Sequence, residues 1–260
     1  MNDTPPVFEV TDLHVRYGAM EAVKGVSFTL AHGETLGIVG ESGSGKSTIA
    51  KALIGIEKPS AGTVVCRAKS VQMVFQDAVG SLNPRMTVRQ TLDEILSHTE
   101  AGCGDGVGYL RGLGARREKM AKLLEIVGLS QAVLEQYPRE MSGGQCQRVS
   151  IARALACEPE VLIADEPVSA LDVSVQARIL NLLRDLRRNL GLSILLIAHD
   201  LAVVKNVCDR VCVMQRGLFV DAGTSEEVFE RPQSDYTKRL LAAVPDVSRA
   251  LRRRYPQMQI

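Results

Sequence analysis

The chain has 260 residues, of which 45% are apolar and 23% charged, a composition typical of a globular protein large enough for one α/β domain with an insertion. The formal net charge of +1 excludes the strong basic field by which many nucleic-acid-binding proteins attract their ligand. No apolar run reaches the roughly 18 residues of a membrane span, and residues 1–6 lack the basic and apolar parts of a signal peptide, so a cytosolic chain is expected.

The first strong signal along the chain is a glycine-rich segment between a strand and a helix. Residues 7–15 alternate apolar and polar side chains, as a half-buried strand does, and 35–39 form a short apolar run typical of a buried strand. A helix is predicted over 49–54. The residues between this strand and this helix fit the pattern G-x-x-x-x-G-K-[ST]: Gly40, Glu41, Ser42, Gly43, Ser44, Gly45, Lys46, Ser47 and Thr48.

This pattern predicts a loop that binds the phosphates of a nucleoside triphosphate. Backbone N–H groups and the N-terminus of the following helix point at phosphate oxygens, and glycines let the loop curl tightly. Lys46 is expected to reach the β- and γ-phosphates, and the Ser47 hydroxyl to ligate Mg²⁺. The alternative, a glycine–serine turn with a chance lysine, leaves the flanking strand and helix unexplained.

A helical insertion is predicted in the middle of the chain. Residues 71–75 form a strand pattern that ends at Gln76, after which helical segments occur near 88–98 and 118–127. Six glycines fall between Gly102 and Gly114. We therefore expect a helical subdomain with a flexible surface loop in its middle.

The next part of the chain predicts parallel strands with a helical crossover. Residues 161–164 and 192–197 are near-continuous apolar runs, typical of strands buried on both faces. Asp165 and Glu166 follow the first run, at the carboxyl end of the strand, where ligands gather in parallel sheets. One carboxylate there can hold Mg²⁺ and the other can orient an attacking water; a solvated acidic turn is the alternative. Between the two runs, apolar residues recur at helical spacing: Val175, Ile179, Leu182, Leu186 and Leu190.

The cysteines and most histidines give no metal signal. Six cysteines form no C-x-x-C pair, and only Cys208 and Cys212 lie close together, so buried reduced thiols are expected. Only His199, at a predicted strand end, has a suggestive setting. The other three histidines are expected on the surface or in loops: His14, His32 and His98.

A second glycine motif completes a recognisable series. Ser142-Gly143-Gly144-Gln145 precedes a predicted helix over 146–156, and by itself would be only a helix cap. With the phosphate loop it belongs to a series in chain order: Gln76, Ser142–Gln145, Asp165–Glu166, Ser169–Asp172 and His199. This series resembles the ATP-binding cassette (ABC) ATPase family over about 8–245.

The resemblance implies a fold and an assembly. The fold is α/β of the P-loop NTPase type, with a mostly parallel sheet, an antiparallel β edge and an inserted α-helical subdomain. The implied domains are an ATPase core over 1–76 and 146–231, a helical subdomain with the signature loop over 77–145, and a C-terminal extension over 232–260. ATP and Mg²⁺ are the implied ligands. Two ATPase subunits pair head to tail, because one chain cannot complete a site.

The resemblance also implies roles for individual residues. Glu166 orients the attacking water, His199 secures the γ-phosphate, and Gln76 touches Mg²⁺ and water and responds to the membrane partner. The implied Mg²⁺ ligands are Ser47, Gln76 and Asp165. Tyr17 matches the aromatic that stacks on adenine, with an ordinary strand-end tyrosine as the alternative.

The signature loop and Asp172 are implied to serve the other subunit. Ser142 and Gly144, with Gly143 and Gln145, would meet the γ-phosphate held by the second ATPase, and Asp172 would communicate between the two sites. The sequence departs from the family at Cys146, where an Arg is common.

The short interval between the phosphate loop and the switch glutamine is a second departure. Lys46 and Gln76 are only 30 residues apart, so a trimmed β edge near 63–68 is expected, with intact chemistry.

Two further segments resemble one branch of the family. Residues 75–88, with Ala78 where Pro is usual, and the Pro-x-x-x-Tyr-Thr-x-x-Leu-Leu segment in 231–245 are similar to oligopeptide, dipeptide and nickel importers. They imply a peripheral ATPase on the cytoplasmic face of the inner membrane that drives peptide uptake. Its implied partners are two membrane-spanning permeases, a second ATPase subunit (self or paralogue) and, indirectly, an extracytoplasmic substrate-binding protein; nucleic acid is not expected.

The transported substrate stays open at this point. Nickel or a metal chelate is the alternative cargo, while an exporter or a non-transport ABC ATPase is less favoured because a single cassette carries both branch segments. The basic tail with Arg249 and 252–254 reads as a solvated helix end, with contact to a membrane surface as the alternative.

Overall fold

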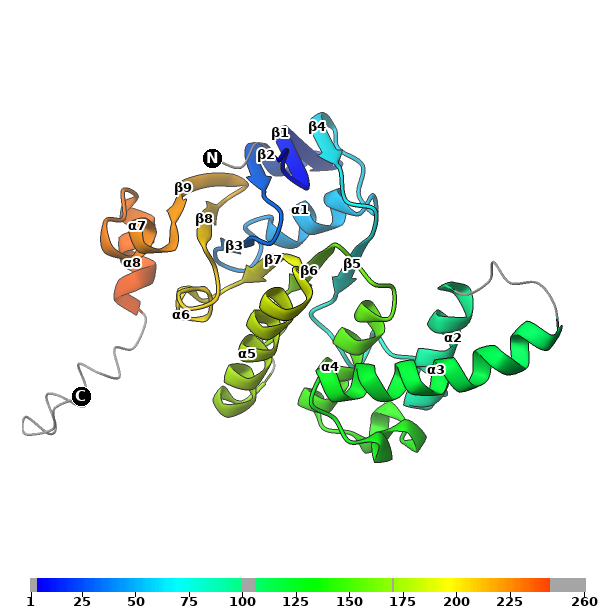
Figure 1. Cartoon of the computed structure of the whole chain (residues 1–260). Helices are drawn as coiled ribbons and strands as arrows, with labels where there is room; N and C mark the ends of the chain where they lie inside the picture. The colour runs from blue at the N-terminus through cyan, green and yellow to red at the C-terminus, as the bar shows by residue number, and fades with distance from the viewer. Residues whose placement is uncertain (1–3, 100–105, 170, 244–260) are drawn as a thin grey trace, which may run out of the picture.

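The computed structural model describes residues 4–99, 106–169 and 171–243, and gives only the backbone of 99 and 106–113. Groups of strands and groups of helices follow one another along the chain, and single strands and helices alternate from α4 to β8 (Figure 1). The strands are β1 (Phe8–Tyr17), β2 (Met20–Leu30), β3 (Thr35–Val39), β4 (Ala61–Cys66), β5 (Val71–Val74), β6 (Val161–Asp165), β7 (Ser193–Ala198), β8 (Arg210–Gln215) and β9 (Leu218–Thr224). The helices are α1 (Lys46–Leu53), α2 (Val88–Thr99), α3 (Gly106–Ile126), α4 (Gly143–Leu155), α5 (Val173–Leu190), α6 (Leu201–Val204), α7 (Ser225–Glu230) and α8 (Asp235–Ala243), with short 3-10 turns η1 (Gln131–Glu135) and η2 (Pro138–Glu140).

The strands form two sheets. A sheet of six has the order β5-β6-β7-β3-β8-β9, in which every neighbouring pair is parallel except β8 and β9. The other sheet, β2-β1-β4, is antiparallel. β3 lies between β7 and β8, so the loop that follows β3 opens at the carboxyl edge, beside the ends of β6 and β7.

The larger sheet is buried on both faces, as continuous apolar strands require. In β7, Ile194 and Leu196 face the cluster that includes α4 and α5, while Leu195 and Ile197 face the cluster that includes α1 and the antiparallel sheet. All four side chains are at most 1% exposed. The alternation of a strand thus distributes one apolar run between two cores.

The helical insertion lies between β5 and α4, as expected. Figure 1 shows α2 and α3 beside the sheet at the end opposite α7 and α8. The prediction of a flexible glycine-rich loop is wrong in part, because α3 begins at Gly106 and runs through Gly114. A helix nucleated over the amphipathic segment 118–126 adds one hydrogen bond for each further residue, which offsets part of the cost of its glycines. Gly102 and Gly104 lie outside the described residues.

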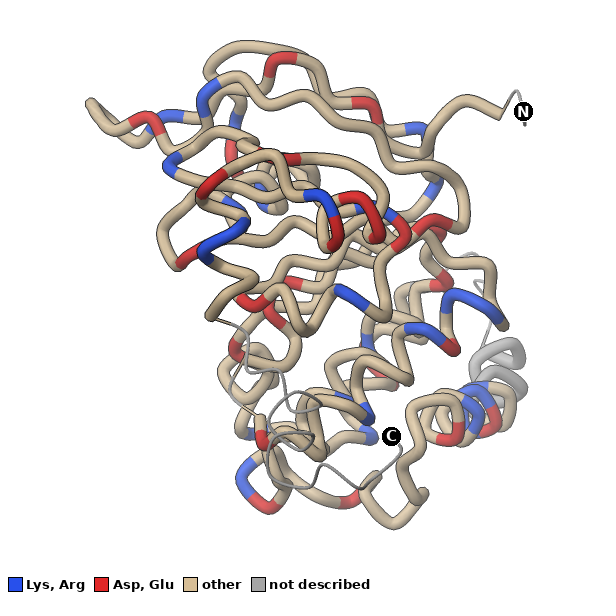
Figure 2. The backbone as a smooth tube through the Cα atoms, turned by 90° about the vertical axis from the view of Figure 1, so that its left-hand side faces the viewer, with Lys and Arg blue, Asp and Glu red and all other residues tan. Residues whose placement is uncertain are grey.

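The charges are interspersed over the surface. On the face in Figure 2, Lys and Arg alternate with Asp and Glu over both sheets and the helices, in line with the net charge of +1. Among the residues that the structure describes, no helix combines the length and hydropathy of a membrane span.

The main sequence expectations for the fold are confirmed, and the thiols need a correction. The mostly parallel sheet, the antiparallel edge and the helical insertion are all present. Cys146, Cys208 and Cys212 are buried, but Cys66 is exposed and Cys157 half-exposed. Cys66 ends β4 at an edge of the antiparallel sheet, where only one neighbouring strand covers it. Cys103 and the arginines at 249 and 252–254 lie outside the described residues.

Candidate functional site

The phosphate loop connects the central strand β3 to α1, and two of its glycines are required by close backbone approach. A Cβ on Gly40 would lie 2.1 Å from the Met214 carbonyl oxygen, and one on Gly45 would lie 2.4 Å from the Ala22 carbonyl oxygen. Gly45 also caps α1 with φ of 110°, in the region that favours glycine. The N-terminus of α1 therefore opens into the loop with free N–H groups for an anion.

Lys46 is the buried cation of the loop. Its Nζ donates hydrogen bonds to the carbonyl oxygens of Gly40 at 2.7 Å and Glu41 at 2.9 Å, and only 4% of the residue is exposed. The same Nζ lies 3.8 Å from Glu166 Oε1. Burial lowers the pKa of Lys46, and the charges of Glu166 and Asp165 oppose that shift. The ammonium is thus held by carbonyl oxygens that an anionic ligand could replace.

Asp165 and Ser47 meet beside the loop. Asp165 is the last residue of β6, and its Oδ1 accepts a hydrogen bond from Ser47 Oγ at 2.9 Å. Burial raises the pKa of the Asp165 carboxyl, a shift opposed by the Ser47 hydrogen bond. A hydroxyl and a carboxylate oxygen suit Mg²⁺, a hard cation that keeps several waters and needs few protein ligands. In the described parts of the chain no three His, Cys, Asp or Glu residues form a metal-binding cluster.

Glu166 joins the loop to two further strand ends. Its backbone has a positive φ of 44°, rare for a residue with a side chain, and its N–H donates to the Ile197 carbonyl oxygen at 3.0 Å. Oε1 faces Lys46, while Oε2 accepts a hydrogen bond from Gln76 Nε2 at 3.0 Å and lies 3.5 Å from His199 Nδ1. Side chains from three segments distant in sequence therefore converge on the carboxylate of Glu166, a residue that is 9% exposed.

The remaining expected site residues lie around this centre or apart from it. A side-chain hydrogen bond with Thr48 places Tyr17 beside the end of the phosphate loop. Burial raises the pKa of Tyr17, and this hydrogen bond opposes that shift. Tyr17 is 39% exposed, so its ring is available to a ligand. Asp172 lies exposed at the N-cap of α5, and its neighbour Ala170 is outside the described residues.

The signature segment caps its own helix. Ser142 Oγ accepts a hydrogen bond from Gln145 N at 3.3 Å, and Gln145 Oε1 accepts one from Ser142 N at 2.9 Å, which is a capping box. Ser142 and Gly143 are exposed, and α4 begins at Gly143, earlier than the predicted 146. Gly143 also lines a pocket with Gln76 and Glu166. Gly144 packs closely on Val175, because a Cβ there would lie 2.6 Å from Val175 Cγ1.

The departures from the family pattern leave the centre intact. Cys146 is fully buried in α4, where its thiol donates to the Pro138 carbonyl oxygen at 3.5 Å. The short interval after the loop is taken up by β4, which leads directly into β5. Both changes lie outside the contacts of Lys46 and Glu166.

Contacts that sequence reasoning missed come from the far end of the chain. Ser44 O accepts a hydrogen bond from Gly217 N at 2.9 Å, and the Tyr236 hydroxyl accepts one from Glu41 N at 3.1 Å. The segment around Tyr236 had a recognisable pattern, but nothing local indicated that it reaches the phosphate loop.

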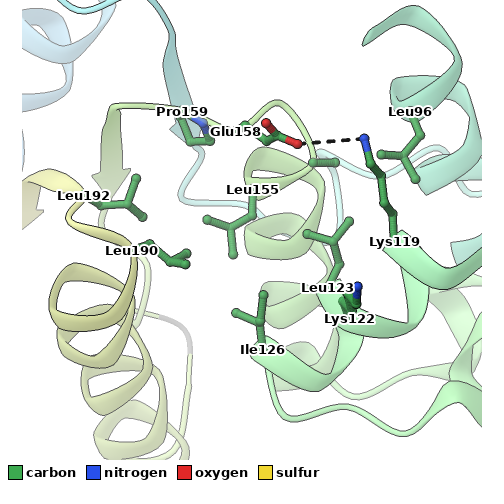
Figure 3. A pocket seen from close by; sticks show the side chains of 11 residues that line it. Leu96, Lys119, Lys122, Leu123, Ile126, Leu155, Glu158, Pro159, Leu190 and Leu192 are labelled. Carbon is green, nitrogen blue, oxygen red and sulfur yellow. Dashed lines mark ion pairs between the residues drawn. The ribbon is translucent and has the colours of Figure 1, made fainter. Parts of the chain in front are cut away.

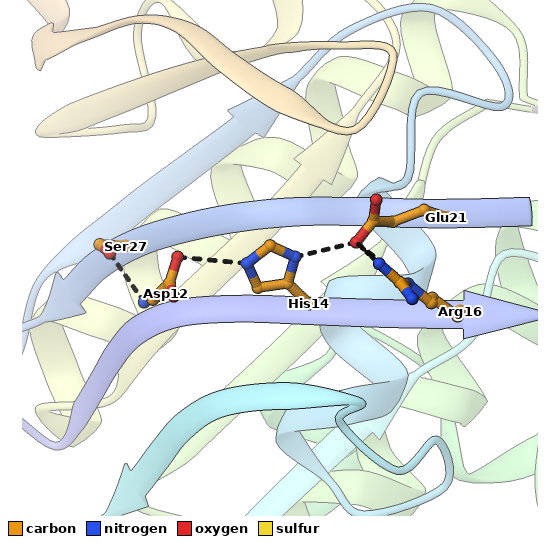
Figure 4. A network of polar contacts seen from close by, with 5 residues as sticks. All are labelled: Asp12, His14, Arg16, Glu21 and Ser27. Atoms are coloured by element: carbon orange, nitrogen blue, oxygen red, sulfur yellow. Dashed lines mark hydrogen bonds and ion pairs between the residues drawn. The ribbon is translucent and has the colours of Figure 1, made fainter.

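A polar network on the antiparallel sheet involves a histidine to which the sequence assigned no role. His14 lies on β1, within the strand predicted over 7–15, and has Nδ1 2.9 Å from Glu21 Oε1 and Nε2 3.2 Å from Asp12 Oδ1 (Figure 4). Arg16 donates to the same Glu21 oxygen at 3.2 Å. The Glu21 hydrogen bond raises the pKa of His14, partly opposed by desolvation. This network is a surface feature, separate from the loop residues.

An apolar groove lies away from the phosphate loop. Figure 3 shows it between α3, the segment before β6 and the end of α5, with Lys119 Nζ and Glu158 Oε1 3.8 Å apart at its edge. Pro159 and Leu192 precede β6 and β7, so the groove is at the amino ends of these strands. Asp165 and His199 are at the carboxyl ends, and the groove is therefore no part of the candidate site.

Comparison with known proteins gives a consistent result. A family model described as ABC transporter matches residues 23–169, more than half of the chain. The oligopeptide transport ATP-binding protein OppF of Lactococcus lactis is 43% identical over 256 residues, covering 92% of this chain and 77% of that protein. The dipeptide transport ATP-binding protein DppF of Haemophilus influenzae is 44% identical over 250 residues, with 90% and 73% covered. A dimeric post-hydrolysis structure of the ATP-binding cassette MJ0796 with ADP and Pi superposes with a TM-score of 0.72 at 26% identity, covering 84% of this chain and 98% of that one.

Proposed function

Because the chain belongs to the ABC transporter family and is an ATP-binding ATPase of that family, we propose that it powers the uptake of di- and oligopeptides across the cytoplasmic membrane. The observation that carries the proposal is the convergence of Lys46, Gln76 and His199 on Glu166 beside the phosphate loop. Relatives named for oligopeptide and dipeptide transport support the cargo class.

Hydrolysis in this proposal depends on positioning and charge neutralisation. Lys46 exchanges the carbonyl oxygens of Gly40 and Glu41 for the phosphates of ATP, and the free N–H groups of α1 hold further phosphate oxygens. Glu166 then accepts a hydrogen bond from the attacking water, in an orientation fixed by Gln76 and its own positive-φ backbone. His199 secures the γ-phosphate.

Magnesium is part of the proposal, with Ser47, Asp165 and Gln76 as the residues that would hold it. The first two already meet at 2.9 Å and present oxygen ligands. When bound, the ion neutralises charge on the phosphate oxygens. In this arrangement the raised pKa of Asp165 has a purpose, because a cation would stabilise the buried carboxylate.

The site is completed by a second ATPase subunit. Ser142 and Gly143 are exposed at the start of α4, so they are accessible to the γ-phosphate held by a partner. A head-to-tail pair would place this loop opposite the partner's phosphate loop, with Asp172 near the boundary. The partner is a second copy or a paralogue, and the dimeric cassette with a similar fold is a precedent for such pairing.

Transport requires membrane partners. We assign the core to 1–76 and 146–231, the helical subdomain to 77–145 and the extension to 232–260. Closure of the pair around ATP would move the segment 76–89 against two permease subunits, which receive cargo from an extracytoplasmic binding protein. The protein would lie peripherally on the cytoplasmic face of the inner membrane.

An affinity pull-down tests this function. Glu166→Gln is expected to trap the ATP-bound pair, and its capture with ATP from detergent-solubilised membranes should recover two multispanning permeases, identified by mass spectrometry. Lys46→Ala is the matched control, since it should not form the ATP-dependent pair. A nickel-type permease would favour the alternative cargo, and recovery of soluble proteins alone would contradict the transporter proposal.

A further inference from the structure

The peptide unit between Gly40 and Glu41 is held from both sides. Its carbonyl oxygen accepts a hydrogen bond from Lys46 Nζ at 2.7 Å, and its N–H donates to the Tyr236 hydroxyl at 3.1 Å. In a trans peptide the C=O and N–H point in opposite directions, so the two contacts fix the plane of this unit. One of these contacts is inside the loop, while the other comes from a residue 195 positions away.

Tyr236 is itself firmly placed. It lies in the first turn of α8 with 6% exposure and packs in the larger apolar cluster. The chain before it is tied to β9, because Asp221 Oδ2 accepts hydrogen bonds from Gln233 N at 2.9 Å and Ser234 N at 3.2 Å. Ser234 Oγ in turn accepts one from Tyr236 N at 3.1 Å. The phenol therefore presents its oxygen from a rigid support.

ATP binding affects the Lys46 contact and the Tyr236 contact differently. Lys46 turns to the phosphates in the proposed function, so the Gly40 carbonyl loses its partner. The Glu41 N–H points away from the Gly40 carbonyl that Lys46 releases, so its bond to the Tyr236 hydroxyl can persist. It is then the contact that keeps this peptide from rotating while the loop holds phosphate.

We propose that Tyr236 is a positioning residue for ATP binding, which fixes the Gly40–Glu41 peptide and thereby keeps the phosphate loop in its binding conformation. The C-terminal segment at 232–243 acquires a role by this contact: it supports the nucleotide site. The inference rests on the proposed function, because it requires that the loop binds ATP.

Tyr236→Phe tests the proposal by removing one oxygen and leaving the ring. In the membrane complex, where the ATPase pair is complete, KM for ATP should rise about tenfold with kcat within about twofold, since a part-buried N–H loses its acceptor away from the reacting atoms. A merely structural role would lower the amount of active protein, and so kcat, without changing KM. Lys238→Ala, on the same helix but in an exposed ion pair with Asp235, is the control and should leave both constants unchanged.

Hydrogen exchange gives a readout that needs no nucleotide. In the ATP-free protein, the Glu41 amide should exchange faster in Tyr236→Phe than in the wild type, while the core strands keep their protection. This measurement reports whether the contact exists, independently of whether it serves ATP binding.

Asp221→Ala tests the route by which the segment acts. Loss of the Asp221 hydrogen bonds to Gln233 N and Ser234 N should raise KM for ATP when Tyr236 is present, by less than Tyr236→Phe does. In the Tyr236→Phe background it should add nothing, because its effect passes through the missing hydroxyl. Full additivity of the two changes would contradict that route.

The outcomes separate this inference from the function on which it rests. An unchanged KM in Tyr236→Phe, with wild-type protein that binds ATP, overturns the positioning role and leaves the proposed function intact. Wild-type protein that binds no ATP overturns both. Faster exchange at Glu41 together with a raised KM and preserved kcat supports the inference.

Discussion

Two polar networks in this protein contain the same kinds of groups and differ in burial. Around Glu166, a lysine, a glutamine and a histidine converge on a carboxylate whose side chain is 10% exposed. Around Glu21, a histidine and an arginine converge on a carboxylate whose side chain is 26% exposed, beside Asp12, whose side chain is 71% exposed (Figure 4). Screening by water makes the second network weak, while the first lies where charges interact strongly.

The pKa shifts of the two networks run in opposite directions. Near the phosphate loop, burial lowers the pKa of Lys46 and raises that of Asp165, so both groups resist their charged forms. On the antiparallel sheet, the mutual hydrogen bond raises the pKa of His14 and lowers that of Glu21, so both favour their charged forms. The surface network is satisfied by its own members, whereas the buried one gains from added ligand charges.

The largest effect is expected from Glu166→Gln. The amide keeps the size of the side chain and cannot act as the base that orients water, so hydrolysis should fall at least about 100-fold while ATP affinity is retained. Single-turnover hydrolysis and equilibrium binding measure the two quantities. Glu125→Gln, an exposed change on α3, is the control, and normal turnover of Glu166→Gln would remove this residue from its role.

Lys46→Ala should act on binding. Loss of the charge-assisted hydrogen bonds to phosphate is expected to weaken ATP affinity about 10- to 100-fold. Titration with ATP measures this directly, and Lys58→Ala removes an equal charge at an exposed position as the control. Equal affinities in all three proteins would contradict the assignment of the phosphate loop.

Asp165→Asn should separate stability from metal binding. The pKa of Asp165 is raised above 3.8 in the folded protein, so its contribution to stability is present below that pH and is lost as pH rises through the folded pKa. The amide oxygen can still accept from Ser47, and the ATP-free variant should melt about 2 °C higher at pH 7.

The same variant should gain less stability from Mg²⁺ and ATP than the wild type does. Thermal unfolding with and without these ligands measures both effects. An ATP-free variant that melts lower at pH 7 would show that burial of the charged carboxylate carries no penalty.

The smallest effect is expected from His14→Gln. Because Glu21 raises the pKa of His14 above 6.5, its ionic contribution is present below pH 6.5 and is lost as pH rises through the folded pKa. NMR titration of the wild-type protein should give a pKa above 6.5 for the His14 ring. ATP hydrolysis by His14→Gln should stay within about twofold of wild type. A pKa below 6.5 would mean that desolvation outweighs the carboxylates.

Much of the candidate site was predictable because its signals are local. The phosphate loop, the acidic pair at the end of β6 and the helix cap at Ser142 each depend on neighbours a few residues apart. The structure has the loop between a strand and a helix and the pair at a strand end, but α1 begins at Lys46, before the predicted 49, and Asp165 belongs to β6. The start of α3 was not predictable, since the glycines between Gly102 and Gly114 have low helix propensity. That part of the helix forms only as an extension of the helix that follows it. The exposure of Cys66 depends on which strand ends a sheet, and no local pattern records that order.

The sequence by itself determined the nucleotide-binding chemistry and the alternation of strands and helices. Only the tertiary structure decided that β3 lies between β7 and β8, which brings Lys46 within 3.8 Å of Glu166 and gives that carboxylate its contacts with Gln76 and His199. It also decided that Tyr236 supports Glu41 across 195 positions. Side-chain periodicity records which face of an element is buried, whereas strand order and long-range contacts arise from how all the buried faces pack together.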